Sequence, residues 1–563
     1  MSPKEEEEYG PIQPPDDFPV VWERPEDAEL LWTRDRTHFS DCLPPLEADF
    51  WRQAWKGRGD LMEKKKGTQR PRMERINGYL YMAHEPLGDL SAEEIEARKK
   101  GQDREADEQR AAMEKLWEEE WMPEIRAHMA FWDAFDLQGA DMETLVAHLE
   151  ETRNRLGPLW DVHFQIVGAA YGAMNKLNDY YKELFEDHGP FDAPRLYQGF
   201  DNLTLEMGRA QWDLSRQVVA SPGVLAVFEE NDVTDILEAL KTTPEGEAFL
   251  EALNEYLETY GQRGDMWGIR FKSWIEDPSL VLRNVKDHLR DDRDPRQNLA
   301  VLAEEREEAV ERVRAHLKGY PEKSVDEFER LLKLAEIGVV LSEDHGFWID
   351  FTCSYKVRRL LMTFGQRFVA AGAIEAAEDV FYFTLDELIE KGTTLEGTDL
   401  KALVAERQAE MAHFETLEPP PALGTRKKPE KKKEKKKDKA EKKEEPEPEE
   451  IPGVVRGSSG SPGKARGPAR VLRSFEEGNR LKPGDVMVVA STSPSWTPLF
   501  GKAVAVVMEV GGLLSHCAVV AREYRIPAVI DVKSATTKIQ DGQILEVDGD
   551  AGTVRIVQGS VRP

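Results

Sequence analysis

The sequence contains few cysteines and no cysteine motif. Its 563 residues include three cysteines, Cys42, Cys353 and Cys517, which stand far apart and form no C-x-x-C pair. This spacing excludes a disulfide framework and a cysteine-ligated zinc site, and it favours a reducing compartment. From the sequence we therefore predict no metal site.

Basic residues are outnumbered, and long apolar runs are missing. The formal net charge is −31, whereas nucleic acids and anionic membranes are bound through patches of Lys and Arg. Binding of a small anionic ligand is still possible, because helix N-termini and a few local arginines can bind such a ligand even in an acidic protein. The first residues, MSPKEEEEYG, lack an apolar signal segment, and no run of about 18 apolar residues occurs. We predict a cytoplasmic protein with no nucleic-acid partner and no membrane partner.

A charged low-complexity segment divides the chain. Residues 417–453, LEPPPALGTRKKPEKKKEKKKDKAEKKEEPEPEEIPG, consist mostly of Lys, Glu and Pro and offer little to bury, which predicts a flexible linker. A flexible chain of about 35 residues has an r.m.s. span of roughly 30–35 Å. The segment is either a solvated spacer or a tether that lets a small domain travel.

The pattern before this linker is mainly helical. Residues 92–130, 299–317 and 324–342 carry charged and apolar residues at helical spacing, so we predict a helical domain over residues 91–416. Residues 1–90 contain Pro-rich loops and many aromatic residues, and the pair Asn77-Gly78 between apolar residues indicates a turn and a short strand. We predict that this first segment is irregular with minor β content.

The pattern after the linker is different. Residues 454–563 contain short runs rich in Val and Ile, punctuated by Gly, Pro and Asp, which predict a small, mostly β domain. One helix is expected directly after His516. The predicted fold class is therefore multidomain, with a large mainly α-helical region followed by a C-terminal β/α domain.

The segment GGLLSHCAVVAREYRIPAVI, residues 511–530, gives the strongest functional signal. It follows a predicted strand, and Gly511 and Gly512 form a turn that lets the backbone approach a ligand. Ser515 is a suitable cap for the next helix, so His516 lies at a helix N-terminus. An imidazole there is disfavoured as a permanent cation but well placed to carry a dianionic phosphoryl group, and it is a competent nucleophile near neutral pH. The alternative is a buried histidine satisfied by hydrogen bonds.

This segment resembles the phosphohistidine motif of the swivelling domain in phosphoenolpyruvate-utilising enzymes. The resemblance extends upstream through GSPGKARGPARV (460–471) and LKPGDVMVVASTSP, and downstream through DGQILEVDGDAGTVRIV. It implies that His516 accepts a phosphoryl group and passes it on, with Gly511, Gly512, Ser515 and Arg522 in the phosphohistidine loop. The sequence departs from the family pattern at Met508, Cys517, Arg525 and Asp531, where threonine, alanine, glycine and glycine are common.

The helical region has a weaker resemblance to a second kind of domain. LYQGFDNLTLEMGRAQWDLSR (196–216), FLEALNEYLETYGQRG (249–264), WIEDP (274–278) and the run starting EDHGFWIDFTCSYKVRRLL are similar to the substrate-binding domain of rifampicin phosphotransferases and of the phenylphosphate synthase phosphotransfer subunit. No segment resembles an ATP-grasp domain, and there is no G-x-x-x-x-G-K-[ST] motif. The resemblance therefore implies a separate ATP-grasp subunit that binds ATP with Mg or Mn and transfers its β-phosphoryl group to His516.

The acceptor site needs cations or donors for the phosphoryl group and a base near the acceptor hydroxyl. Candidates cluster within fifteen residues, and Arg358 and Arg359 cannot both face the same site on a helix. Further candidates are Arg263, which follows a Gly turn, and two histidines in the first segment. The candidates are His345, Asp350, Tyr355, Arg358, Arg359, Arg263, His38 and His84. Ordinary polar contacts between helices are the alternative interpretation.

These observations predict a phosphotransferase subunit with a phosphohistidine intermediate. Its predicted acceptor is a small aromatic, phenol-type hydroxyl compound, because the nucleotide domain is not fused to this chain. One alternative is a component of a rifampicin-type antibiotic phosphotransferase. Another is a noncatalytic docking or regulatory protein in which His516 is inert.

Overall fold

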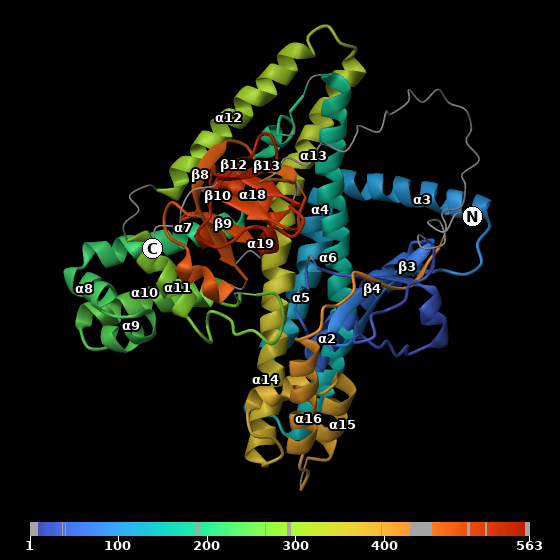
Figure 1. Ribbon diagram of the computed structural model, residues 1–563, viewed down its shortest axis with the longest axis vertical. Coiled ribbons are helices and arrows are strands. Elements are labelled where there is room, and N and C mark those ends of the chain that lie inside the picture. Colours follow the sequence, from blue (N-terminus) through green and yellow to red (C-terminus); the bar gives the residue numbers. More distant parts are fainter. Residues whose placement is uncertain are drawn as a thin grey trace.

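The computed structural model describes residues 9–427 and 453–557, with gaps at residues 37, 40, 187, 190, 265, 290–293, 396, 474, 493–495 and 513–514. Figure 1 shows two long helices running along the molecule, a small sheet beside them, and the C-terminal domain packed against their upper half. The mainly helical region and the C-terminal β/α domain predicted from the sequence are confirmed.

The N-terminal segment contributes strands to a five-stranded antiparallel sheet. In spatial order the strands are β1 (Gly10–Pro11), β5 (Ala422–Arg426), β2 (Leu31–Arg34), β4 (Tyr79–Pro86) and β3 (Gln69–Ile76). Asn77 and Gly78 join β3 to β4, and both have positive φ, 47° and 82°, as a two-residue type I′ hairpin turn requires. The predicted turn and strand are confirmed.

A long helix, α2 (Pro45–Lys64), occupies the middle of the segment that we predicted to be irregular. Its pattern is obscured in the sequence by glycines that serve packing. A Cβ atom on Gly57 would lie 2.1 Å from the carbonyl oxygen of Gly157 in α6 (Met142–Leu184), so the two helices cross backbone against backbone. The prediction of an irregular segment is wrong for these residues.

The charged linker begins later than residue 417. Ala422–Arg426 forms β5, which pairs with β1 and β2, and Leu423 is fully buried. The run Ala422–Gly424 supplies one buried apolar side chain and a glycine with φ of 80°. This is enough for a strand here, because β1 and β2 provide hydrogen-bond partners on both sides. Residues 428–452 lie outside the described residues.

Two helical runs form the axis of the helical region. One is α6 (Met142–Leu184); the other is the continuous run of α13 (Glu322–Gly346), the π-helical segment η4 (Phe347–Cys353) and α14 (Ser354–Ala370). α6 and α13 pack along each other. A Cβ atom on Gly338 would lie 2.8 Å from the carbonyl oxygen of Ala170, so this glycine sets how closely the helices approach.

Shorter helices surround this axis. They are η1 (Pro25–Glu29), α3 (Ala92–Ala111), α4 (Met113–Leu116), η2 (Trp117–Trp121), α5 (Met122–Asp133), η3 (Pro194–Tyr197), α7 (Leu203–Ala220), α8 (Pro222–Glu230), α9 (Val233–Leu240), α10 (Pro244–Tyr260), α11 (Ser279–His288), α12 (Pro295–His316), η5 (Ala377–Tyr382), α15 (Leu385–Thr393) and α16 (Lys401–Phe414). Within the described part of the chain, no helix combines the length and the apolar character that a membrane crossing needs.

The C-terminal domain contains an eight-stranded mixed sheet. In spatial order its strands are β6 (Val454–Arg456), β13 (Thr553–Val557), β12 (Ile544–Asp548), β8 (Lys464–Leu472), β9 (Val486–Val489), β10 (Ala505–Met508), β11 (Ala528–Ile530) and β7 (Ser458–Ser461). Strands β8 to β11 are parallel neighbours, and the other pairs are antiparallel. Short helices complete it: η6 (Phe475–Arg480), α17 (Thr497–Phe500), α18 (His516–Glu523) and α19 (Ala535–Lys538). The helix predicted after His516 is α18.

The C-terminal domain is docked on the helical region. Its Trp496, Leu499 and Phe500 belong to one hydrophobic cluster with residues of α7 to α11. α18 packs against α12, where Arg525 Nη2 lies 2.5 Å from Glu305 Oε1. Lys502 also pairs with Asp287 of α11. An apolar face with ion pairs at its rim therefore holds the two parts together.

Candidate functional site

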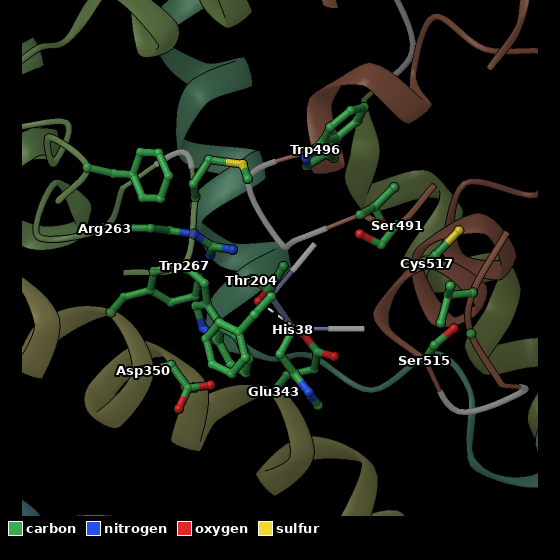
Figure 2. Close-up of a pocket in the computed structure, with 18 of the residues that line it drawn as sticks. His38, Thr204, Arg263, Trp267, Glu343, Asp350, Ser491, Trp496, Ser515 and Cys517 are labelled. Carbon is green, nitrogen blue, oxygen red and sulfur yellow. Dashed lines mark hydrogen bonds between the residues drawn. The ribbon is translucent and has the colours of Figure 1, made fainter. Parts of the chain in front are cut away.

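A cavity of about 400 Å³ lies between the helical region and the C-terminal domain. Figure 2 shows the two walls facing each other, with Trp267, Asp350 and Glu343 on one side and Ser491, Ser515 and Cys517 on the other. Aromatic residues of the helical wall, among them Phe39, Trp267 and Phe351, make much of the lining apolar. The cavity thus combines an apolar wall with a few convergent polar groups, the usual character of a small-molecule site.

Three buried polar side chains meet at the helical wall. Imidazole and carboxylate atoms of His163, His345 and Asp350 all lie within 4.8 Å of one another. His163 Nδ1 is 3.0 Å from Asp350 Oδ1, and the two imidazole ring centroids are 4.9 Å apart. His163 comes from α6, whereas the other two residues come from α13 and η4.

The π-helical segment explains how His345 and Asp350 share a face. In an α-helix, residues five apart point about 140° away from each other. A π-turn pairs each residue with the fifth one along, so it stacks such residues on one side. η4 begins two residues after His345 and contains Asp350, and single π-turns inside α-helices occur frequently at functional sites.

His345 is held as a neutral imidazole. Its Nδ1 lies 2.7 Å from the carbonyl oxygen of Leu341, one helical turn earlier, so Nδ1 carries the proton and Nε2 keeps a lone pair. Burial, followed by the neighbouring His163, lowers the pKa of His345 to about 4. At neutral pH this residue therefore offers an acceptor atom rather than a charge.

His38 lies on the cavity wall nearer to solvent. Its ring stacks on Trp267 with centroids 5.1 Å apart, and its Nδ1 lies 2.9 Å from Asp35 Oδ2. Desolvation lowers the pKa of His38, but the hydrogen bond and the charge of Asp35 outweigh it and raise the pKa. His38 is therefore a candidate donor for an anionic group in the cavity.

Arg263 also lines the cavity, and it is almost fully buried. Its guanidinium carbon lies 4.4 Å from the ring centroid of Phe351 and 5.8 Å from that of Trp274. Nη1 contacts the sulfur of Met207 at 3.6 Å. The two aromatic rings hold the guanidinium in place at the cavity wall.

The remaining candidates of the helical region do not line the cavity. Arg358 is buried and binds Glu276 and the carbonyl oxygens of Ile269 and Arg270, so it holds the loop that carries Arg263 and Trp267. Arg359 is exposed and lies over the ring of Tyr355. The two arginines point in different directions, as we expected from their spacing on a helix. Neither of them faces the cavity. His84 is exposed on β4, in the N-terminal sheet.

The C-terminal wall is formed by the predicted phosphohistidine loop. Gly511 has φ of 148°, and a Cβ atom there would lie 2.4 Å from Met508, so this position requires glycine. Ser515 is the N-cap of α18, and its buried Oγ has no hydrogen-bond partner among the described residues. Gly511, Ser515 and Cys517 line the cavity, whereas Gly512 is exposed and outside its lining.

His516 is the first residue of α18. Its side chain lies outside what the structure describes. Its backbone stands between Ser515 and Cys517, which both line the cavity. Burial raises the pKa of Cys517 to about 12, so this thiol stays protonated and is no competing nucleophile.

Arg522 lies on a different face of α18. It donates to the carbonyl oxygen of Gly460 at 2.9 Å and lines a second cavity with Arg195, Arg312 and Arg525. It therefore does not share the cavity of Ser515. Two departures from the family pattern, Arg525 and Asp531, have left-handed backbones with φ of 55° each, which explains why glycine is common at those positions.

Sequence patterns missed several polar residues of the helical wall. His163 stands in the middle of a long helix, Trp267 lies in an irregular loop, and Thr204 donates to Glu343 at 3.2 Å across two helices. No spacing within the sequence connects these residues, because they meet only when α6, α7 and α13 pack. His163 in an otherwise apolar helical face was the one available signal.

Comparisons with known proteins agree with this division of the chain. Residues 162–343 match the family described as rifampicin phosphotransferase fourth domain, and residues 481–552 match the mobile domain of PEP-utilising enzymes. These matches cover the helices that carry His163 and Glu343, and the loop that carries His516.

Several curated proteins are similar over most of this chain. Chondramide synthase cmdD of Chondromyces crocatus is 34% identical over 96% of this chain, which spans 14% of that protein. The uncharacterized phosphotransferase YvkC of Bacillus subtilis is 30% identical over 71% of this chain, which spans 48% of it. A rifampicin phosphotransferase of Streptomyces sviceus is 30% identical over 70% of this chain, which spans 44% of it. The chain thus spans less than half the length of these relatives.

Proposed function

We propose that this chain, with segments matching the mobile domain of PEP-utilising enzymes and the fourth domain of rifampicin phosphotransferases, is the carrier and acceptor part of a phosphotransferase. The observation that carries the proposal is the cavity whose one wall is the loop around His516 and whose other wall is the polar cluster of the helical region. A carrier group and an acceptor site on facing walls are what a transfer between them requires.

His516 is the proposed phosphoryl carrier. The free backbone N–H groups at the start of α18 and the dipole of that helix favour a negatively charged phosphoryl group at its N-terminus. In the transfer step the phosphorus–nitrogen bond breaks and its electron pair stays on the imidazole. A phosphorus–oxygen bond forms with the acceptor hydroxyl, and the hydroxyl proton ends on the imidazole, which restores neutral His516.

The helical wall would bind and activate the acceptor. Arg263 and His38 are placed to balance the charge of the phosphoryl group, because both line the cavity and both have cationic or donor character. The imidazole of His345 and the carboxyl group of Asp350 would orient the acceptor hydroxyl by hydrogen bonding, and the proton itself passes to His516. The aromatic residues of the wall exclude water, which would otherwise hydrolyse the phosphohistidine.

The donor would be ATP with Mg or Mn, bound by an ATP-grasp unit outside this chain. The relatives are more than twice as long as the part that this chain matches, which leaves room in them for such a unit. In the proposed cycle the C-terminal domain visits that unit, receives the β-phosphoryl group on His516 and returns to the docked position.

A hydroxylated antibiotic of the rifampicin type is the acceptor class best supported by the relatives, several of which are rifampicin phosphotransferases. The named relatives give no comparable support to the phenol-type acceptor predicted from the sequence. The aromatic residues of the cavity wall would pack against an aromatic ring of either compound.

The test is labelling with ATP that carries radioactive phosphorus in the β position, in the presence of a purified ATP-grasp partner. We expect an acid-labile, base-stable label on this chain that His516→Ala abolishes and the exposed control His413→Ala retains. Label should then move to rifampicin in preference to phenol. A label that persists in His516→Ala would place the carrier elsewhere, and a chain that never takes label would be a docking protein instead.

A further inference from the structure

We propose that His163, His345 and Asp350 form a binding site for a divalent transition-metal ion of the zinc type. The sequence predicted no metal site, because its cysteines form no motif and these three residues have no motif spacing. The ligand set arises from packing α6 against α13 and η4. Two imidazoles and one carboxylate are donors that Zn²⁺, Co²⁺ and Mn²⁺ accept in proteins.

The distances fit an ion between the three groups. Two ligand atoms on one tetrahedral zinc ion lie roughly 3.3 Å apart when each bond is about 2.0–2.1 Å long. His163 Nδ1 and Asp350 Oδ1 are 3.0 Å apart, and the whole group lies within 4.8 Å. Binding of an ion would draw the three ligand atoms closer together than the 4.8 Å that encloses them here.

The relation of His163 to Asp350 is unlike an ordinary hydrogen bond. Both atoms are buried, and neither forms a hydrogen bond with any residue that the structure describes, despite their separation of 3.0 Å. Buried polar atoms are normally paired by hydrogen bonds, so two such atoms that lie close together without forming a hydrogen bond need an explanation. A metal ion between them would explain the arrangement, because the lone pairs of both atoms would then point at the ion.

The proton on His345 is already placed for metal binding. Metal-ligating histidines usually donate their other ring N–H to a carbonyl or carboxylate, which fixes the tautomer and the ring orientation. His345 Nδ1 donates to the carbonyl oxygen of Leu341 at 2.7 Å, and this leaves Nε2 as the ligand atom. The partner is a backbone group of the same helix, so the orientation is rigid.

The site would keep an open coordination position. All three residues line the cavity between the domains, although each residue is at most 7% exposed. Three protein ligands with a fourth position left for water or substrate are typical of catalytic rather than structural zinc sites. If the proposed function holds, the acceptor hydroxyl would occupy that position, where the ion would lower its pKa.

Metal binding is measured on the full chain, without ATP, partner or acceptor, so its outcome does not depend on the proposed function. The protein is stripped with a chelator, dialysed against Zn²⁺ and analysed for bound metal, and Co²⁺ is titrated while its visible absorption is followed. We expect about one ion per chain and the intense bands of a tetrahedral Co²⁺ site. Absence of both signals in the wild-type protein overturns the proposal.

Two conservative variants and a matched control locate the ion. Asp350→Asn and His163→Gln preserve side-chain size, and both should lose the bound ion and the Co²⁺ bands. His148→Gln is the control, because His148 is also a histidine of α6 with 7% exposure, but it packs on Phe131 and Phe135 away from the cavity. His148→Gln should bind the ion as the wild type does.

Unfolding of the metal-free proteins separates loss of binding from loss of fold. We expect Asp350→Asn to unfold at a temperature close to that of the metal-free wild type. Added Zn²⁺ should raise the unfolding temperature of the wild type and of His148→Gln, but not that of Asp350→Asn or His163→Gln. Retention of the ion by both variants, or equal loss in the control, overturns the assignment.

Discussion

Glu523 connects the docking of the C-terminal domain to pH. This residue is at the C-terminal end of α18 and is largely covered by the helical region, where it accepts a hydrogen bond from the backbone of Gly199. Burial raises the pKa of Glu523 to about 7, although Arg522 and this hydrogen bond oppose the effect and Glu343 adds to it. An undocked domain would expose the carboxyl group to water and return its pKa to the ordinary value.

The sign of the effect follows from which state binds the proton more tightly. The docked state has the higher pKa, so protonation favours docking. Docking is therefore strongest below the ordinary pKa of about 4.5, weakens as pH rises to about 7, and is constant above that. The difference between the two pKa values corresponds to about 3 kcal/mol, or roughly 300-fold in the docking equilibrium.

The substitution Glu523→Gln removes this penalty. At pH 8 we expect the variant to dock more tightly than the wild type, and its docking to lose the pH dependence between about 4.5 and about 7. Fluorophores on cysteines introduced at the exposed positions Glu307 and Asp550 report the separation of the two parts by energy transfer. The native cysteines are buried and do not interfere.

The control variant is Glu546→Gln, which removes the same charge from β12, where the side chain is 45% exposed. It should follow the wild type at every pH. Our reasoning fails if docking of the wild type is insensitive to pH in this interval, or if Glu523→Gln keeps the wild-type pH dependence.

Three further predictions concern packing, backbone strain and the thiol. Gly57→Ala should lower the free energy of unfolding by about 1–3 kcal/mol, because the new Cβ would lie 2.1 Å from a backbone oxygen of α6; Gly208→Ala, which has open space in α7, should not lower it in denaturant titrations. Arg525→Gly should leave the free energy of unfolding unchanged or raise it. The glycine relieves about 1–2 kcal/mol of strain from the left-handed backbone, whereas the lost exposed ion pair with Glu305 is worth at most about 1 kcal/mol. A fall of several kcal/mol in the free energy of unfolding would contradict this. Cys517→Ala should keep transfer activity, and native Cys517 should resist iodoacetamide at pH 8 by mass spectrometry, because burial raises its pKa to about 12.

The sequence alone determined the main divisions of the chain and the helix that begins at His516. Helical periodicity between residues 91 and 416, and Val-rich runs with turns after residue 453, depend on local patterns that each element carries in its own residues. The helix at His516 is local as well, and the structure has it as predicted. The roles of these residues in phosphoryl transfer stay predictions.

Only the tertiary structure decided which polar residues share the cavity. His345 and Asp350 come together because η4 is a π-turn, and no α-helical spacing anticipates this. His163 joins them from another helix, whereas Arg358 turns away to hold a loop. Likewise, the five residues of β5 show no strand pattern of their own. They form a strand because β1 and β2 pair with their backbone on either side. Contacts between distant segments depend on how helices and strands pack, and a local pattern carries no record of that packing.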